Sequence, residues 1–276
     1  MPAPDKSLFT QLTKTMFVAK AIVLPEKWKS PGEQFPRAFK AVELAVPPNA
    51  PTTLFKAASL NKYHVDAARD ISQKFEGYIE GICGAICDAI GQWQSQATIA
   101  NVIINGPVGM LMPGGVTGPP LGQLILASAP MKTPQEIKYS QAVAAAFGPA
   151  WLAWHTGMMG TLMYPAFAAF PGPMAPPTPN IPMPLIALPS PGEALMAPPT
   201  LKKVMASAFG DASAAHAEKL FDCLCTAFAP VFMMFKGSNQ VKNVLGMGPI
   251  PTFAPPFVPV GPVVMGTGTG APGCLA

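Results

Sequence analysis

Three stretches of the chain place apolar residues three or four positions apart, the spacing that puts side chains on one stripe of a helix. In the stretch 65–93 the stripe is formed by Ile71, Phe75, Ile79, Ile82, Ile86 and Ile90. In the stretch 212–235 it is formed by Leu220, Leu224, Phe228, Val231 and Phe235. A further helix-forming run lies between them at 135–163. The pattern therefore predicts three long helices, separated by segments of a different kind.

Two of these runs contain residues that interrupt helices. Pro230 lies inside the last run, and Gly148-Pro149 lies inside the middle one. Proline lacks the backbone N–H that a helix interior needs, and its ring clashes with the preceding turn. We expect the last helix to be kinked or split at Pro230 and the middle helix to break at Gly148-Pro149.

Each helix-forming run is followed by a segment in which glycine and proline recur every few residues. The segment 255–262 is the densest, since Pro255, Pro256, Pro259 and Pro262 fall within it. These prolines remove backbone donors and exclude both a regular helix and a central strand. Polyproline-like extended chain with short turns or edge strands is what remains.

One of these segments echoes another without a gap. Residues 101–130 align with 243–272 at an offset of 142, with nine identical pairs. The identities begin with Asn101-Val102 against Asn243-Val244. An echo of this length indicates that a unit of supersecondary structure was duplicated.

The strongest shared feature of the echo is a Gly-Pro step that occurs a third time between the two copies. The residues of the three steps are Gly106, Pro107, Gly172, Pro173, Gly248 and Pro249. Glycine permits backbone angles that other residues resist, and proline fixes the angle that follows. We interpret the three steps as structural turns that fix the shape of the backbone.

These patterns predict a mainly α fold with few short strands. The chain would consist of an N-terminal arm at 1–58 and three repeat units at 59–131, 132–199 and 200–276. Each unit would be a helix followed by a Pro-rich extended segment. The three units would pack as an intramolecular pseudo-trimer in one composite body.

Composition argues against disorder. The chain has 35 Pro and 25 Gly, but 50% of its residues are hydrophobic and only 12% are charged. Disordered chains have the opposite balance of apolar and charged residues. A chain of this kind must bury much of its surface against itself or against partners.

Charge is concentrated near the N-terminus. Residues 1–76 hold 11 of the 18 Lys+Arg and 7 of the 14 Asp+Glu, and no charged residue occurs from Tyr139 to Gly192. No run of consecutive basic residues points to nucleic acid, so a protein neighbour is the better partner for this arm. The residues that we expect to bind it are Trp28, Phe35, Arg37 and Phe39.

No residue pattern indicates catalysis, a metal or a cofactor. Cys83 and Cys87 are four residues apart, and Cys223 and Cys225 are two apart, so neither pair has the spacing of a metal or redox loop. We expect these thiols to be buried, whereas Cys274 could be exposed. His64, His155 and His216 fall one in each unit but not at equivalent positions, and we expect half-buried or surface histidines.

The glycine-rich stretch 266–270 resembles a phosphate-binding loop only at first sight. No helix follows it to supply a dipole, so we expect a flexible or turn-rich segment. Because few carboxylates and histidines can be brought together in the centre of the chain, we predict that the protein is not an enzyme.

An alternative is an integral membrane protein with Gly/Pro-broken helices around 139–171. This uncharged block exceeds the length of a membrane span, and Trp151 and Trp154 could anchor it at the lipid interface. Against this, the helix at 65–93 carries charged residues such as Asp66, Arg69 and Asp70 and could not span lipid.

The three Gly-Pro steps and their Pro-rich sequels resemble the organisation of axial components in contractile phage tails and phage-tail-like injection systems. The resemblance covers most of residues 59–276 but rests on no family signature and assigns no functional residue. It implies a structural protein in a hub, spike-associated or plug role near the baseplate, packed against trimeric hub, spike or tube subunits. Its repeats would resolve a symmetry mismatch in the particle.

No secretory signal pattern is visible at the N-terminus, because Asp5 and the polar residues 10–14 interrupt it. We therefore expect synthesis in the cytoplasm, with free thiols, followed by incorporation into the particle.

Overall fold

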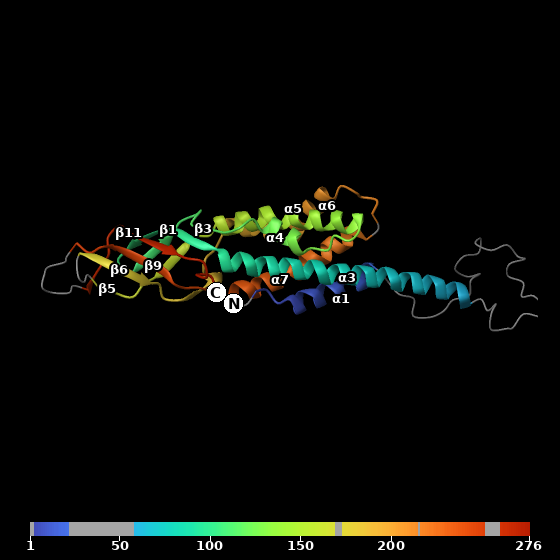
Figure 1. Ribbon diagram of the computed structural model, residues 1–276, viewed down its shortest axis with the longest axis horizontal. Coiled ribbons are helices and arrows are strands. Elements are labelled where there is room, and N and C mark those ends of the chain that lie inside the picture. The colour runs from blue at the N-terminus through green and yellow to red at the C-terminus, as the bar shows by residue number, and fades with distance from the viewer. Residues whose placement is uncertain (1–2, 22–57, 169–172, 215, 252–259) are drawn as a thin grey trace, which may run out of the picture.

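The computed structural model describes residues 3–21, 58–168, 173–214, 216–251 and 260–276. Helices gather at one end of an elongated molecule and strands at the other (Figure 1). The helical end contains α1 (Lys6–Ala21), α3 (Ala58–Gln96), α4 (Leu121–Ser128), α5 (Pro134–Thr156), α6 (Pro198–Phe209) and α7 (Ala217–Ser238). Two short 3-10 helices lie at η2 (Leu185–Ala187) and η3 (Pro191–Met196).

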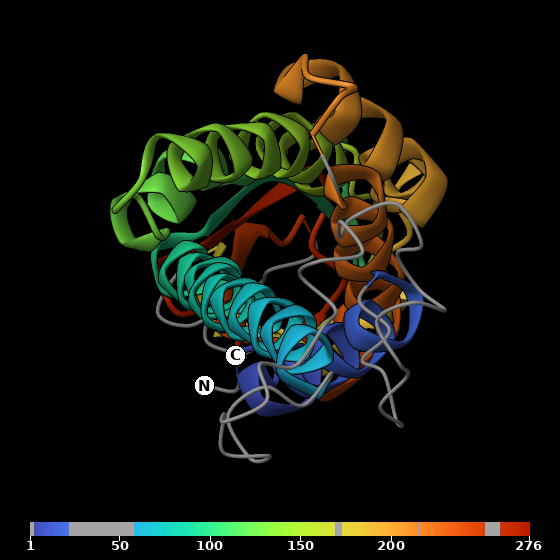
Figure 2. The ribbon, with the colours of Figure 1, turned by 90° about the vertical axis from the view of Figure 1, so that its right-hand side faces the viewer.

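Three long helices surround the long axis of the molecule. Seen along that axis, α3, α5 and α7 form three sides of the helical end (Figure 2). Helix α1 packs against α3 and α7, whereas α4 and α6 both pack against α5. The predicted stripes face inward, since Ile79, Ile82, Ile86 and Ile90 of α3 are fully buried. Ile71, nearer the start of α3, is 44% exposed and lies outside this core.

Aromatic rings fill the space between these helices. Phe228 of α7 contacts Phe9 of α1 with ring centroids 5.7 Å apart, and Phe147 of α5 at 4.8 Å. Phe17 of α1 contacts Phe75 of α3 at 4.8 Å. Rings of this size bury large apolar areas, so these contacts between different helices hold the helical end together.

The break predicted at Gly148-Pro149 does not occur, and α7 is not split at Pro230. Helix α5 continues through Pro149 to Thr156, and α7 continues through Pro230 to Ser238. Tertiary packing overrides the local penalty, because both helices bury most of one face between their neighbours. Helix α5 begins with a capping box in which Thr133 and Glu136 each accept a backbone N–H from the other.

The strand end contains a seven-stranded antiparallel sheet. Six strands follow the order β4-β2-β1-β11-β9-β6, and β3 pairs with β1 beside them. Their bounds are β1 (Thr98–Asn105), β2 (Val108–Leu111), β3 (Val116–Thr117), β4 (Gly160–Met163), β6 (Met174–Pro179), β9 (Val244–Pro249) and β11 (Gly266–Gly270). Two small two-stranded sheets pair β5 (Phe167–Ala168) with β10 (Val260–Gly261) and β7 (Met183–Pro184) with β8 (Gln240–Val241).

Each long helix is followed by strands that lie beside one another or at the two edges of the sheet. Strands β1 and β2 follow α3, and β9 and β11 follow α7. The two edge strands, β4 and β6, both follow α5. The edges approach each other, because the Ile181 N–H donates to the Met163 carbonyl at 2.7 Å. The sheet is therefore strongly curled.

The prediction of a mainly α fold with few short strands is wrong. The seven-stranded sheet makes the protein a mixed α/β structure. Prolines do not prevent the sheet, because they lie where the ladder tolerates them. Pro176, Pro177 and Pro179 fall on the edge strand β6, which has a register shift between Ala175 and Thr178. The central strands β1 and β11 contain no proline.

Where both copies are described, the sequence echo has a structural counterpart in its first residues and differs near its end. Asn101 and Asn243, the first aligned pair, both adopt left-handed backbone angles, with φ of 53° and 57°. Further along, residues 121–128 form helix α4, whereas the aligned residues 263–270 include strand β11. The division into repeat units at 59–131, 132–199 and 200–276 stays a prediction.

Candidate functional site

Side chains on the strands mostly alternate between a buried and an exposed face, with irregular stretches in β1 and β6. Along β9 and β11, every second residue is buried, and the exposed positions lie between them. The buried face of the curled sheet carries Val102 and Ile104 of β1, and Leu162 of β4. The period of two is what a pleated strand imposes when only one face is covered.

Tyr164, directly after β4, occupies the inside of the curl. A Cβ atom added to Gly109 of β2, Gly246 of β9 or Gly268 of β11 would lie 2.7 to 2.9 Å from atoms of this tyrosine. Three strands that are not all neighbours thus approach one ring. Because these three glycines lack side chains, the ring occupies the space that their side chains would otherwise fill.

The Tyr164 ring is sealed from water. It is 2% exposed, and its hydroxyl has no hydrogen-bond partner among the described residues. Burial raises the pKa of this phenol to about 12. The group is therefore neutral across the physiological range and acts as a packing element.

Large apolar side chains occupy the opposite, outward face. The exposed members on five strands of the sheet are Ile103, Met110, Met163, Met174, Leu245 and Met247. We call these six residues the apolar collar. Single exposed apolar residues are ordinary on soluble proteins, but a contiguous set indicates an interaction surface.

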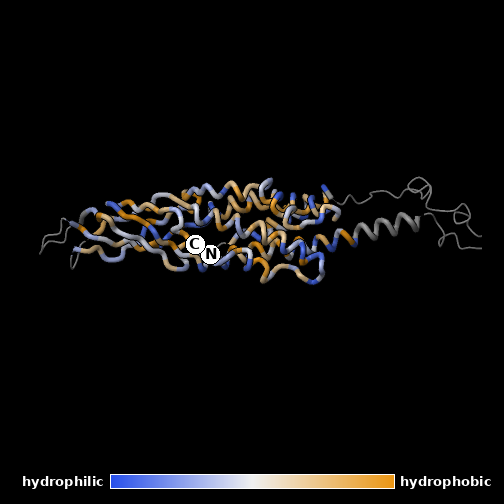
Figure 3. Tube along the Cα trace, turned by 90° about the horizontal axis from the view of Figure 1, so that it is seen from above, coloured by the Kyte–Doolittle hydropathy of each residue, from blue (hydrophilic) through white to orange (hydrophobic). Residues whose placement is uncertain are grey.

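The strand end also lacks formal charge. The segments 98–131, 139–192 and 243–276 contain no Asp, Glu, Lys or Arg, and they include every strand of the seven-stranded sheet. Hydrophobic stretches continue along this end of the trace (Figure 3). Apart from Lys242, which lies between β8 and β9, the charged side chains of the described residues lie on the helices and on the turns beside them.

The three predicted Gly-Pro turns share one hydrogen-bonding feature. The carbonyls of Pro107, Pro173 and Pro249 accept the N–H groups of Tyr164, Ile250 and Val264 at 2.8, 2.7 and 3.0 Å. Two of these bonds join strands that follow different long helices. The proline carbonyls therefore help to hold the strand segments to one another.

The glycines of these steps are not alike. Gly106 adopts a left-handed φ of 66°, as the prediction of a special backbone requires. Gly248 does not have a positive φ, but a Cβ there would lie 2.5 Å from the Gly266 Cα, so close approach of two strands explains it. Gly172 lies outside the described residues.

The residues predicted to bind a partner through the arm, Trp28, Phe35, Arg37 and Phe39, also lie outside the described residues. The first part of the arm, however, belongs to the body of the protein. Phe9 and Phe17 of α1 are fully buried in the helical core. A test of the arm should therefore keep residues 3–21.

An aromatic cluster closes the boundary between the helices and the sheet. Trp93 of α3 lies 5.1 Å from Trp151 of α5 and 6.1 Å from Trp154, measured between ring centroids. All three are fully buried, so Trp151 and Trp154 do not stand at a surface as interfacial anchors would. Their indole N–H groups have no acceptor among the described residues, and packing alone holds the cluster.

His155 is part of the same cluster. Its ring lies 5.1 Å from that of Trp93, and the side chain is 2% exposed. Burial lowers the pKa of His155 to about 4, although the nearby Trp151 backbone opposes the shift. The imidazole is therefore neutral at physiological pH.

The surroundings of the cysteines make their thiols unreactive. All five are free and buried, which corrects the expectation that Cys274 could be exposed, since it is 1% exposed. Burial raises the pKa of Cys83, Cys87 and Cys225 to about 12. Thiols in this state are poor nucleophiles.

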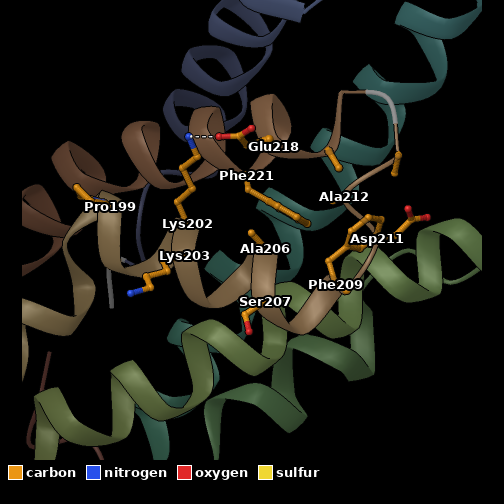
Figure 4. Close-up of a pocket in the computed structure, with 13 residues that line it drawn as sticks. Pro199, Lys202, Lys203, Ala206, Ser207, Phe209, Asp211, Ala212, Glu218 and Phe221 are labelled. Atoms are coloured by element: carbon orange, nitrogen blue, oxygen red, sulfur yellow. Dashed lines mark ion pairs between the residues drawn. The ribbon is translucent and has the colours of Figure 1, made fainter.

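A hollow of about 610 Å³ lies between α6 and α7 (Figure 4). Phe209 and Phe221 line it, and at its rim Lys202 pairs with Glu218 at 3.1 Å and with Asp222 at 3.5 Å. The described lining contains no histidine or cysteine to serve as a base or a thiol nucleophile. Within the described chain, no group of three His, Cys, Asp or Glu side chains could hold a metal ion.

The uncharged block around 139–171 is not one continuous helix. It spans α5, β4 and β5. Of the described helices, α7 is the one with the length and apolar composition to cross a membrane. About 61% of that apolar window is buried inside the protein, as in the core helix of a soluble domain.

Comparisons with models of known protein families, with curated proteins and with solved structures found no match.

Sequence reasoning missed the curled sheet and Tyr164 at its centre. The stretch 266–270, predicted to be flexible or turn-rich, is the central strand β11. Its alternation of Gly266, Gly268 and Gly270 with Thr267 and Thr269 has a period of two. That period was the available signal for a strand whose inner face must stay free of side chains.

Proposed function

We propose that the protein is a non-enzymatic structural component on the axis of a large assembly, such as a contractile tail-like particle. Its role there would be that of a hub, spike-associated or plug subunit. The segments that follow α3, α5 and α7 would let one chain meet partners arranged around the same axis, and so resolve a mismatch of symmetry.

The observation that carries this proposal is the absence of charge from a strand end that exposes apolar residues. Exposed apolar residues such as Leu152 and Met234 also occur at the helical end, but α5 and α7 carry charged residues as well. The strand end presents the apolar collar and has no charged residue in the segments that form its seven-stranded sheet. A free soluble protein would expose such a surface to water at a cost, whereas an assembled subunit buries it. The elongated body, with its long helices running lengthwise at an incline to the long axis, fits an axial position (Figures 1 and 2).

The packed interior of the sheet favours a plug or spike role over that of a subunit with an open channel. Tyr164, Ile104 and Val102 fill the space inside the curl, and all three are at most 2% exposed. A packed interior of this kind leaves no open channel along the sheet.

The experiment that tests the proposal is a mass-resolved copy number. Particles should be purified from cells that produce the full chain with its natural neighbours. We expect the chain to sediment with a large particle, at one copy for each ring of six tube subunits. Recovery only as a free monomer, or at equal numbers with the tube subunit, would refute the axial role.

An integral membrane protein is the second candidate, favoured by the length and composition of α7. Carbonate extraction of membranes separates the two. A membrane protein stays in the pellet, whereas a particle component is released. We expect release, because the apolar window of α7 is mostly buried against other helices.

A further inference from the structure

We propose that the apolar collar sits inside a ring-shaped opening formed by several copies of one protein subunit, with an uncharged and apolar wall. This inference rests on the proposed function and names the kind of partner that the strand end would meet. It follows from three features of the collar: its continuity across strands, its direction and its chemistry.

The collar is continuous across the sheet. On its outward face, Thr161 pairs with Met110, Met110 with Ile103, Ile103 with Thr267, and Thr267 with Met247. All five of these residues are exposed. This row crosses β4, β2, β1, β11 and β9 without interruption. Residues opposite each other on adjacent strands are close neighbours, so the row forms one band.

The band points in many directions. The inward neighbours on β2, β9 and β11 converge on Tyr164, since Cβ atoms at Gly109, Gly246 and Gly268 would all touch its ring. Successive side chains on a strand point to opposite faces. The outward residues of these strands therefore diverge from a common centre. A flat partner would cover one side of the band, whereas a surrounding partner covers all of it.

The chemistry of the band selects an uncharged wall. No Asp, Glu, Lys or Arg occurs in the segments that build the sheet, so a charged wall would lose its hydration and find no counter-charge. Four of the six collar residues are methionines, at 110, 163, 174 and 247. Methionine is flexible and can adapt to differently shaped contacts. That suits a collar whose strands differ from one another but meet identical subunits.

Lipid is a poorer occupant than protein. The same row contains Thr161 and Thr267, whose hydroxyl groups would lie in hydrocarbon. The edge strands β4 and β6 form no ladder with each other, although the Ile181 N–H beyond β6 donates to the Met163 carbonyl of β4. The other backbone groups along these edges would be left in lipid. Each unsatisfied backbone group in a bilayer costs several kcal/mol, and a protein wall can satisfy such groups.

Site-specific photo-cross-linking tests the ring directly. The photoreactive residue p-benzoylphenylalanine should replace Met110, Met163 or Met247, one at a time, in the full chain produced with its natural neighbours. We expect all three positions to give an adduct with the same added mass. A chain with the probe at both 110 and 247 should give a species that carries two copies of that subunit.

A charge-insertion pair supplies the matched control. Met110 on β2 and Met234 on α7 are both 55% exposed. Met110→Lys should lower recovery in the particle at least about tenfold, because it places an unpaired charge against an apolar wall. Met234→Lys should leave recovery unchanged. Both variants should keep the thermal unfolding of the natural chain, which shows that folding is not the cause.

Other outcomes overturn the collar proposal. Adducts with lipid, adducts with a second copy of this chain, or an adduct from one position alone would each do so. Sedimentation tests the axial function and cross-linking tests the ring, so each proposal can be refuted without the other. A chain that cross-links to one ring subunit from all three positions but never sediments with a large particle would refute the axial function and keep the ring. A chain that sediments with the particle but cross-links from one position alone would keep the axial function and refute the ring.

Discussion

The helical end and the strand end of the molecule differ in the side chains that form their cores and their surfaces. At the helical end, large aromatic rings from α1, α5 and α7 interdigitate, and ion pairs such as Lys14–Glu80 at 3.2 Å decorate the outside. At the strand end, Tyr164 packs among glycines and against one other ring, that of Phe167 at 5.5 Å between centroids. The outside there carries methionine, isoleucine, leucine and threonine without charge.

This difference separates a surface suited to water from one suited to contact. Charged side chains keep the outside of a helix hydrated and soluble. The sheet has no such groups, so its stability must come from what lies inside the curl. The helical end has many apolar contacts that can share the loss of one residue, whereas the strand end depends on a few.

The largest expected effect comes from removing the central ring. Tyr164→Ala should lower the free energy of unfolding by about 3–5 kcal/mol, the range for deleting a large buried aromatic side chain. The cost should lie at the top of that range, because Phe167, with its ring centroid 5.5 Å away, is the one aromatic neighbour of this ring among the described residues. Neighbouring Gly109, Gly246 and Gly268 have no side chains that could move into the cavity. Denaturant-induced unfolding followed by circular dichroism measures it.

Two matched variants sharpen this comparison. Tyr164→Phe should be neutral or slightly stabilising, since the removed hydroxyl is buried without a partner. Phe228→Ala, at the helical end, should cost less than Tyr164→Ala, because Phe9, Phe147 and Phe232 can relax around it. An equal or larger loss for Phe228→Ala would contradict the contrast between the two cores.

The helices could be predicted because their signal is local and repeated. The stripe from Ile79 to Ile90 recurs at helical spacing, and these residues are fully buried. The first and last residues of the helices were predicted less accurately, since α3 begins at Ala58 and not at residue 65. The breaks expected at Pro149 and Pro230 are absent because contacts with neighbouring helices, invisible in the sequence, outweigh a local penalty.

The sheet could not be predicted from the same kind of signal. Six of its buried positions are glycines, and β11, in which three of these fall, has no apolar alternation at all. Tyr164 reaches glycines on β2, β9 and β11, contacts between residues far apart in sequence. The Gly106-Pro107 step separates β1 from β2, whereas Gly248-Pro249 forms the end of β9. The hydrogen bonds of the proline carbonyls follow from the pairing of strands. The partner-binding role of the arm stays a prediction.

A second prediction concerns the boundary between the two ends, where His155 is buried against Trp93. Its pKa in the folded protein is lowered to about 4, below the ordinary value of 6.5. Between these values the unfolded chain binds more protons than the folded one, so stability falls as the pH falls from about 6.5 towards 4. Over this window the loss should be on the order of 3 kcal/mol for this group.

Unfolding measured at several pH values checks this expectation, with His155→Gln as the control. The variant cannot take up the proton, so the part of the pH dependence that falls between about 4 and 6.5 should shrink. Both ends should lose stability together, because the cluster joins α3 and α5 directly above the sheet. An unchanged pH profile in the variant would show that His155 is not the group responsible.

The smallest expected effect lies on the charged outside of the helical end. Glu80→Gln removes the partner of Lys14, in a pair whose carboxylate side chain is 65% exposed. Exposed ion pairs contribute about 0–1 kcal/mol, and salt screens them. We expect a loss within that range at low ionic strength that disappears at about 1 M salt, where charges more than about 3 Å apart are screened. A loss of unfolding free energy above this range that persists at high salt would show that charge stabilises the helical end as strongly as packing does. The helical end and the uncharged sheet would then differ in the source of their stability as well as in their solubility.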